Sequence, residues 1–566
     1  MSPLINFEVL WTDSRTPQRK ELLQHHAGVL PLGHAPGHHH YCEKGVEMKF
    51  PRLLLPLLIP VFLILSLRAA HISTAGAGTK APKTVKALSC SAADVQHALN
   101  QANDGDTVSI PAGTCHWTTG IQYVLVGSLT MTGAGDQSLG GGDKTIIVDD
   151  MNPHGDPPLI LITTAAGQTF RFTGITLRGG SMKTTYNGAI RITGTSKAVR
   201  VDHNHFDHIT NQSLTLSGWE YGVIDHNLFD YHKTQVTVRH GGWNGEPDQW
   251  GDQSWADSSN FGSDKFVFIE DNVFNGSGTL VGGGGGANDC DHGGRLVFRY
   301  NTLNNAFFQV HEMEGRGQGC RAYEVYNNTL NAPNIMHFFA YLRTGTGLFW
   351  GNTTTGVNSF ISAHNDRSET INGGFMPPPR SWGKCGKLLG PSTWDGNTDE
   401  TGYPCLNQLG RGKGDLLMNP FPAAKTSGAS AGTWPREALE PIYVWNNTFD
   451  PPTHAPNAAL WLTYSEERGV ILENRDYYLQ LPNYNEPKAV FNGTAGVGQG
   501  VLSKRPATCT PLVAYWATDT NTLYQCSAKD TWTVYYTPYT YPHPLQSMAS
   551  VPTPVAPAKT KVTAVH

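Results

Sequence analysis

Charged side chains near the ends of apolar segments could catalyse proton transfer on a charged substrate. The candidate catalytic residues are Arg239, His240, His311, Glu312 and Arg316. Arg239, Arg299 or Arg316 could neutralise a substrate carboxylate. His240, His311 or a suitably placed arginine could then remove the neighbouring proton, while an acid protonates the leaving oxygen. This set of residue types predicts β-elimination on a uronic-acid polysaccharide.

Aromatic and basic side chains around these residues could hold the substrate. The candidate substrate-binding residues are Trp243, Trp250, Trp255, Arg299 and Arg343. The three tryptophans follow closely after Arg239, and flat apolar rings pack well on sugar rings. We therefore expect an extended polysaccharide as the partner of this region.

Two other functions fit the same part of the sequence. Glycoside hydrolysis requires two carboxyl groups on either side of the bond, and Glu312 with Asp289 or Asp291 is a conceivable pair. A glycan-binding or adhesin-like surface protein would need no acid–base pair at all. Convergence of the candidate catalytic residues in one cleft would favour an enzyme, and their dispersal would favour binding.

Acidic residues also recur at one position of successive repeats. Asp202, Asp225 and Glu270 each lie two residues before a repeated asparagine, and Arg299 occupies that position in the following repeat. Alternation along a strand places the four side chains on the outer face. Their carboxylates could bind Ca²⁺, or they could simply form a solvated face.

A repeated asparagine indicates the elements that must position these residues. It ends an apolar segment in each repeat and is found at Asn204, Asn227, Asn272, Asn301, Asn328, Asn352 and Asn447. Most intervals suit one coil of a solenoid, with insertions in the two long ones. Side chains at one repeat position then stack, and each inward asparagine can bond the next. The sequence predicts an all-β parallel β-helix with lateral loops, one at about 241–263 and one at about 364–437.

The N-terminal part of this solenoid predicts a helical cap followed by a strand. Ser91 can cap a helix that carries Val95 and Leu99 on one face, and the strand 107–113 follows. The segment Asp104–Gly113, DGDTVSIPAG, resembles the start of the first coil in the pectate-lyase-like superfamily. This resemblance implies a right-handed parallel β-helix.

A second resemblance concerns the segment around Arg239. Thr237–Gly241, TVRHG, looks like the LTLRHG strand of the chondroitinase-B and alginate-lyase family, in which that arginine is catalytic. The resemblance implies a catalytic role for Arg239. Those enzymes carry a catalytic lysine on the preceding coil, where this chain has Asn211–Ser213, and Lys233 instead lies on the same coil as Arg239.

The ends of the chain suggest export. Residues 48–77 combine a basic start, a short apolar run and a small-residue cleavage site, as in a secretory signal peptide. We interpret residues 1–47 as a mis-assigned start, 85–500 as the β-helix, 501–546 as a small hairpin unit and 547–566 as a disordered tail. The hairpin unit either caps the last coil or binds carbohydrate. We expect a secreted monomer with no transmembrane segment after signal cleavage.

Composition and cysteines agree with an extracytoplasmic protein. The chain has 15% charged residues and a net charge of −5, which gives no electrostatic case for binding nucleic acid. Apart from Cys42, the cysteines fall into neighbours along the sequence: Cys90 and Cys115, Cys290 and Cys320, Cys385 and Cys405, Cys509 and Cys526. In an oxidising compartment they predict four local disulfides, with buried free thiols as the alternative.

Overall fold

The computed structural model describes most of the chain between residues 81 and 547. The described ranges are 81–152, 157–180, 188–209, 212–230, 234–240, 257–276, 286–311, 319–363, 409–412, 438–450, 458–462, 471–483 and 486–547. The predicted start, signal peptide and tail, and the Cys385–Cys405 pair, lie outside these ranges. Within them, no helix is long and apolar enough to span a membrane.

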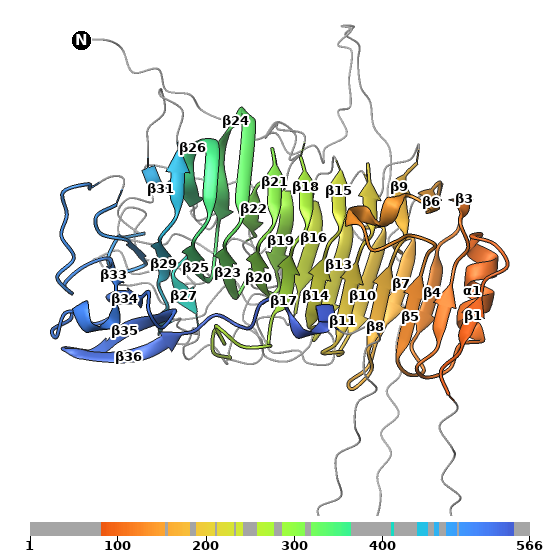
Figure 1. Ribbon diagram of the computed structural model, residues 1–566, viewed down its shortest axis with the longest axis horizontal. Coiled ribbons are helices and arrows are strands. Elements are labelled where there is room, and N and C mark those ends of the chain that lie inside the picture. The colour runs from red at the N-terminus through yellow and green to blue at the C-terminus, as the bar shows by residue number, and fades with distance from the viewer. Residues whose placement is uncertain are drawn as a thin grey trace, which may run out of the picture. The chain divides into compact units, whose positions relative to one another are not determined.

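Three parallel sheets wind around one core and form a right-handed parallel β-helix (Figure 1). Sheet A has twelve strands in the order β1 (Thr84–Lys86), β2 (Thr107–Ser109), β5 (Leu129–Thr132), β8 (Phe170–Thr173), β11 (Val199–Asp202), β14 (Gly222–Asp225), β17 (Val267–Glu270), β20 (Arg295–Arg299), β23 (Ala322–Tyr326), β25 (Thr346–Trp350), β29 (Ile442–Trp445) and β32 (Tyr477–Leu479). The predicted fold is confirmed.

The other two sheets complete each coil. Sheet B contains β3 (Gly113–Trp117), β6 (Thr145–Asp149), β9 (Thr176–Gly179), β12 (His205–Asp207), β15 (Leu228–Asp230), β18 (Val273–Asn275), β21 (Thr302–Asn304), β24 (Thr329–Leu342), β26 (Thr353–Ala363) and β30 (Thr448–Asp450), with β22 (Phe308–Val310) and β31 (Ala458–Leu462) at its side. Sheet C contains β4 (Ile121–Val124), β7 (Ile160–Thr163), β10 (Ile190–Gly194), β13 (Gln212–Gly218), β16 (Thr234–Arg239) and β19 (Gly286–Asp291).

The repeated asparagines form the predicted ladder at the turn between sheets A and B. The side-chain oxygen of Asn227 accepts hydrogen bonds from the backbone N–H and the side-chain amide of Asn204, at 2.9 and 3.1 Å. The same pair of bonds continues through Asn272, Asn301, Asn328, Asn352 and Asn447. The ladder thus satisfies buried backbone donors at the turn.

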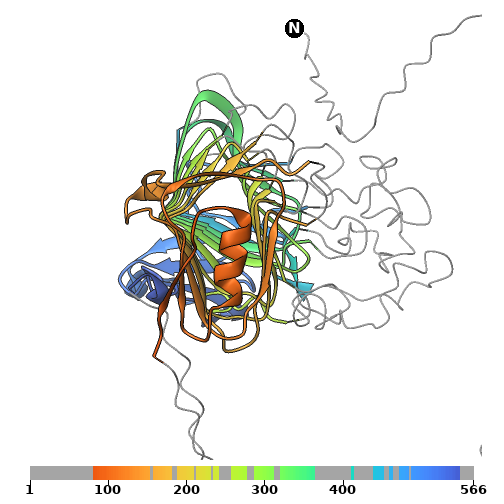
Figure 2. The same cartoon turned by 90° about the vertical axis from the view of Figure 1, so that its right-hand side faces the viewer.

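The N-terminal end is closed by α1 (Ala92–Asn100), which lies across the first coil in the end-on view (Figure 2). The hydroxyl of Ser91 accepts a hydrogen bond from the Asp94 N–H at 3.2 Å, as an N-cap residue does. Val95, Ala98 and Leu99 are buried against the coil. The helix therefore covers apolar surface that the terminal coil would otherwise expose.

A four-stranded sheet near the C-terminus packs beside sheet A. It contains β33 (Val497–Gly500), β34 (Ala514–Ala517), β35 (Thr522–Ala528) and β36 (Thr531–Tyr536). The rings of Trp350 and Trp516 lie 5.3 Å apart, and the Tyr536 hydroxyl donates to Glu324 at 2.8 Å. A short antiparallel pair, β27 (Arg411–Gly412) with β28 (Ala438–Leu439), and the 3₁₀ turns η1 (Leu139–Gly142), η5 (Leu502–Lys504) and η6 (Pro544–Ser547) complete the described elements.

Candidate functional site

The outer face of sheet C carries the charged residues that the sequence analysis singled out. Val238 and Cys290 point into the core, so their neighbours Arg239 and Asp291 point outward. The two outward residues are partners in the β16–β19 register. Asp289 lies two residues before Asp291 and therefore on the same face.

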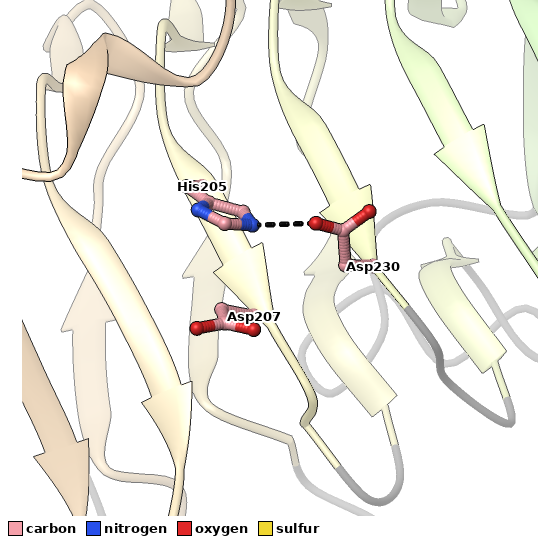
Figure 3. A group of neighbouring side chains, drawn as sticks. All are labelled: His205, Asp207 and Asp230. Atoms are coloured by element: carbon pink, nitrogen blue, oxygen red, sulfur yellow. Dashed lines mark hydrogen bonds and ion pairs between the residues drawn. The ribbon is translucent and has the colours of Figure 1, made fainter.

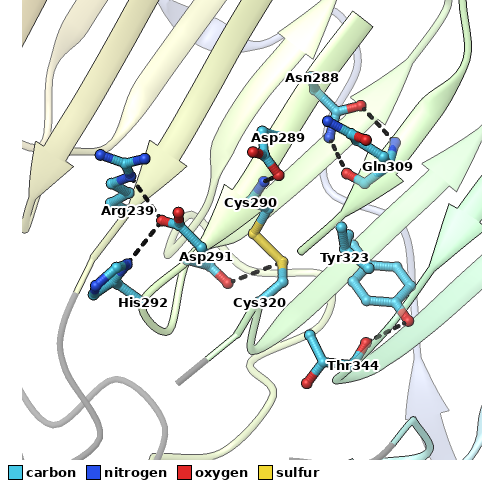
Figure 4. The surroundings of a disulfide bond; sticks show 12 residues. Arg239, Asn288, Asp289, Cys290, Asp291, His292, Gln309, Cys320, Tyr323 and Thr344 are labelled. Atoms are coloured by element: carbon cyan, nitrogen blue, oxygen red, sulfur yellow. Dashed lines mark hydrogen bonds and ion pairs between the residues drawn. A yellow bond between two sulfur atoms is a disulfide. The ribbon is translucent and has the colours of Figure 1, made fainter. Parts of the chain in front are cut away.

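Arg239 and Asp291 form an ion pair on this face, near the edge strand β19 (Figure 4). The arginine Nε donates to the Asp291 carboxylate at 2.8 Å. The Nδ1 atom of His292 lies 3.0 Å from the same oxygen. Burial alone would raise the pKa of Asp291, but the positive charge of Arg239 and the two nearby histidines, His292 and His311, hold it well below its usual range. Asp291 is therefore ionised.

Asp289 experiences the opposite effect. Burial raises the pKa of this carboxyl, and the negative charge of Asp291 raises it further, against the lowering influence of His311, Arg343 and Arg239. Its side chain also accepts a hydrogen bond from its neighbouring backbone N–H at 2.9 Å. Two carboxyls whose pKa values are shifted in opposite directions are a common arrangement of an acid and a base in an active site.

His311 and Arg343 bring an imidazole and a guanidinium to the same face. The His311 N–H donates to the Cys290 carbonyl at 2.9 Å, which aligns the end of β22 with the end of β19. The Arg343 Nε donates to the Val310 carbonyl at 3.3 Å, and its guanidinium lies 5.2 Å from the Tyr341 ring centre. We call Arg239, Asp289, Asp291, His311 and Arg343 the charged cluster.

Covalent and hydrogen bonds fix the coil that carries the two aspartates. The disulfide between Cys290 and Cys320 ties β19 to the next coil, with Cα atoms 5.0 Å apart (Figure 4). The Asn288 side chain donates to the Gln309 carbonyl at 2.7 Å and accepts from the Gln309 N–H at 3.2 Å. These bonds hold Asp289 and Asp291 in place between two coils.

Three of the four predicted disulfides lie within the described residues, and all three are formed. They join Cys90 to Cys115, Cys290 to Cys320 and Cys509 to Cys526. Disulfides of this kind persist in oxidising compartments.

The predicted catalytic residues have three different outcomes: two of them converge, two lie outside the described residues, and His240 lies elsewhere. Arg239 and His311 converge with Asp289 and Asp291, since both lower the pKa values of the aspartates through their charge. Glu312 and Arg316, and the candidate sugar-binding residues Trp243, Trp250 and Trp255, lie outside the described residues. Arg343, predicted to bind substrate, lies near Asp289 and lowers its pKa through its charge.

His240 takes a different place from the predicted one. It follows the outward Arg239 and is fully buried, beside the rings of Trp219 and Tyr221. Burial lowers the pKa of His240 to about 4, so its ring is neutral, and Nδ1 donates to the Gly218 carbonyl at 2.8 Å. His240 therefore joins the ends of two strands and does not face the charged cluster.

The acidic column is in register as predicted, but each of its carboxylates forms an ion pair with an arginine. Asp202 pairs with Arg171 at 2.6 Å, Asp225 pairs with Arg200 at 2.9 Å, and Glu270 pairs with Arg299. Asp202, Asp225 and Glu270 are all fully buried. The arginines supply the positive charge that calcium would otherwise supply, so this column is corrected from a calcium site to a buried ion-pair ladder.

Arg299 also belongs to this ladder, so its predicted role in binding substrate is wrong. Residues 537–547, which we call the C-terminal segment, cover it. The Arg299 guanidinium donates to the carbonyls of Tyr539 and Thr540, both at 2.8 Å, and to the Tyr326 hydroxyl at 2.7 Å. Because Arg299 is fully buried by these partners, it holds the segment on sheet A and does not bind substrate.

One group on sheet B has the composition of a metal site: His205, Asp207 and Asp230, whose possible ligand atoms lie within 4.8 Å of one another (Figure 3). However, His205 Nδ1 lies 2.8 Å from Asp143, and its Nε2 lies 2.9 Å from Asp230. Asp207 pairs with Arg178. A ring with both nitrogens against carboxylates is an imidazolium with no lone pair for a metal, so we interpret this group as an ion-pair network.

Two polar residues of this face, His292 and Arg191, were not found by sequence reasoning. His292 follows Asp291 and contacts its carboxylate. Arg191, on the outer face of β10, is close enough to Arg239 for their charges to repel. The alternation of Ile190, Arg191 and Ile192 was a usable signal for Arg191, because an arginine between two core residues of a strand must point outward.

Comparison with known proteins gives distant structural likenesses. No protein-family model and no curated protein sequence matches the chain. A crystal structure of alginate lyase from Paenibacillus sp. str. FPU-7 is 14% identical with a TM-score of 0.31, over 49% of this chain and 97% of that one. A family 28 exopolygalacturonase from Yersinia enterocolitica is 12% identical with a TM-score of 0.22, over 50% of this chain and 74% of that one. At such identities the chemistry must be argued from the residues of this chain.

Proposed function

We propose that the protein is a secreted carbohydrate-active enzyme that cleaves an acidic polysaccharide by β-elimination at the charged cluster on sheet C. The observation that carries this proposal is the convergence of Arg239, Asp289, Asp291, His311 and Arg343 on one outer face. The three disulfides support an extracellular location.

The charge of the cluster favours an anionic substrate. Arg239 and Arg343 bring two positive charges, whereas Asp291 alone is held firmly in its ionised form. Asp289 retains its proton to a higher pH because its pKa is raised. The face therefore attracts a carboxylate-bearing sugar more strongly than a neutral one.

The reaction assigns one task to each kind of group. Arg239 or Arg343 neutralises the sugar carboxylate, and His311 removes the C5 proton. The C4–C5 double bond forms as the C4–O bond breaks, and Asp289 donates its proton to the leaving oxygen. The protons balance, since His311 gains the proton that C5 loses and Asp289 loses the proton that the leaving oxygen gains.

Hydrolysis is the second candidate, and the opposite pKa shifts of the two aspartates favour it. Asp289 would protonate the leaving oxygen, and Asp291 would activate a water as the base. Residues i and i+2 of a strand are about 6.6 Å apart, which leaves space for such a water. Both candidate reactions thus use Asp289 as the acid.

One experiment separates the candidates. Purified protein beginning at residue 78 is incubated with pectate, alginate and glycosaminoglycans, and both the ultraviolet absorbance of unsaturated uronate ends and new reducing ends are followed. Elimination predicts both signals, and hydrolysis predicts reducing ends alone. Neither signal, with retention on immobilised polysaccharide, would contradict an enzyme and leave a glycan-binding protein.

A further inference from the structure

Four polar side chains beside the charged cluster are buried without a hydrogen-bond partner. They lie on strands β13 and β16 and are Ser213, Ser217, Gln235 and Thr237, each no more than 1% exposed. The Ser213, Ser217 and Thr237 hydroxyls, and both polar atoms of the Gln235 amide, have no partner within the described part of the chain. We call these four residues the polar floor.

The register of sheet C places the polar floor directly beside the cluster. Ser217 is the strand partner of Arg239, and Thr237 is the strand partner of Asp289. The core residues of these strands, Leu214, Leu216, Val236 and Val238, alternate with the floor residues. The floor therefore points outward, on the same face as the charged cluster.

Unpartnered buried polar groups are costly, so this concentration requires an explanation. A buried hydroxyl or amide without a partner loses its bonds to water and gains none in return. The neighbouring hydroxyl of Thr215, which lies between Thr237 and Arg191 in register, does have a partner. It donates to the Gln212 side chain at 3.2 Å. The polar atoms of the four floor residues therefore remain without hydrogen-bond partners among the described residues of the folded protein.

Two arginines on the same face influence each other through their charges. Arg191 of β10 and Arg239 of β16 repel each other across β13. Asp291 already pairs with Arg239, and a further anionic group lying over β13 would be attracted by both guanidinium groups. Hydrogen-bonding groups between two arginines are suited to a sugar residue that carries both hydroxyls and a carboxylate.

We propose that the polar floor and Arg191 form a second sugar subsite, which holds the acidic residue next to the cleaved one. This inference rests on the proposed function and gives the substrate a direction. The polysaccharide runs across the strands, from the charged cluster on β16 and β19 toward β10. Hydroxyls of the bound sugar complete the hydrogen bonds of the floor, and its carboxylate lies toward Arg191.

The first test is binding by Thr237→Val, which keeps the side-chain volume and removes the hydroxyl. Affinity electrophoresis in gels containing pectate or alginate measures retention, in a Asp289→Asn background that prevents cleavage. We expect about 3- to 10-fold weaker retention, as for the loss of one hydrogen bond. Thr346→Val is the matched control, since it removes a buried hydroxyl of sheet A that already donates to the Pro441 carbonyl, and its retention should be unchanged.

The second test is thermal stability without polysaccharide, which a purely structural hydroxyl would affect differently. Thr237→Val should unfold at the same or a higher temperature than wild type, because a methyl group replaces a buried hydroxyl that has no partner. Thr346→Val should unfold at a lower temperature, because the Pro441 carbonyl loses its donor. A lower unfolding temperature for Thr237→Val would show that its hydroxyl is bonded in the fold and would overturn the proposal.

The outcomes separate this inference from the proposed function. Retention of Thr237→Val equal to that of Asp289→Asn alone, while wild type cleaves polysaccharide, would overturn the subsite and leave the enzyme intact. Weaker retention of Thr237→Val, while wild type cleaves none of the polymers, would support the subsite and overturn the enzyme. Absence of both retention and cleavage for wild type would overturn both.

Discussion

Asp289 and Asp291 lie two residues apart on the outer face of β19, yet their surroundings shift their carboxyl pKa values in opposite directions. Burial and the neighbouring negative charge raise the pKa of Asp289. Arg239 stands directly against Asp291 and lowers its pKa despite burial. One strand therefore presents a carboxyl with a raised pKa and an ionised carboxylate on the same face, and both groups are anchored by the Cys290–Cys320 disulfide.

Replacing Asp289 by Asn should abolish cleavage and preserve the fold. The amide has the shape and neutrality of the protonated acid but cannot donate its proton to a leaving oxygen. Wild-type activity should fall as pH rises through the raised pKa of Asp289, and initial rates over a pH series measure this limb. Asp450→Asn, at an exposed position of sheet B, is the control. Wild-type rates for Asp289→Asn would exclude Asp289 as the acid.

Replacing Arg239 by Met should reduce kcat/KM by about 100-fold or more, since a charge that stabilises the transition state is lost. The pKa of Asp291 should rise toward its usual value, because its nearest cation is removed. Arg239→Lys retains the charge without the guanidinium geometry and should lie between the two. Steady-state kinetics on the cleaved polymer provide the measurement, and equal activity of the Met and Lys variants would contradict an electrostatic role.

The local features of the fold were accessible from the sequence because they repeat or lie close together. The asparagine ladder, the capped helix α1 and the three disulfides each follow from spacing along the chain. That His240 does not face the charged cluster could also have been predicted from the sequence. Arg239 and His240 are adjacent, so only one of them can point outward from a strand, and the outward residue is the one in register with Asp291.

The packing of the C-terminal segment over the acidic column could not be predicted in this way. Its residues were placed correctly on one outer face, but Arg299 contacts Tyr539, 240 residues later, and Glu270 accepts from the His543 N–H, 273 residues later. No repeat or local pattern links segments so far apart. An outward column of charge on a solenoid therefore remains ambiguous between a solvated face, a cation site and a covered ladder until the covering segment is known.

Breaking the buried pair of Glu270 and Arg299 should strongly destabilise the protein. Arg299→Met leaves the Glu270 carboxylate without its cation and should lower the free energy of unfolding by about 3–5 kcal/mol. Glu270→Gln added to Arg299→Met should recover part of this loss, because no unpaired charge remains. Denaturant unfolding measures both variants. Stabilisation of wild type by calcium, reversed by EDTA and lost in Glu270→Gln, would instead support a cation at this column.

A buried glutamic acid near the end of β13 should give stability a distinct pH dependence. Glu220 is fully buried, its carboxyl accepts a hydrogen bond from the Thr164 hydroxyl, and burial raises its pKa to about 8. The folded protein therefore keeps a proton that the unfolded chain releases above the ordinary pKa of a glutamic acid. The stability that this proton gives is complete below that ordinary pKa and is lost as pH rises through about 8, with a slope of up to about 1.4 kcal/mol per pH unit.

Glu220→Gln should remove this slope, because the amide stays neutral at every pH. Denaturant unfolding of wild type and variant between pH 5 and 9, a range of roughly four units that brackets the shifted titration, measures the difference. Glu486→Gln, at an exposed position, should behave as wild type. Parallel pH profiles for wild type and Glu220→Gln would mean that Glu220 is ionised in the folded protein. The carboxylate would then have to be stabilised by more than the Thr164 hydroxyl.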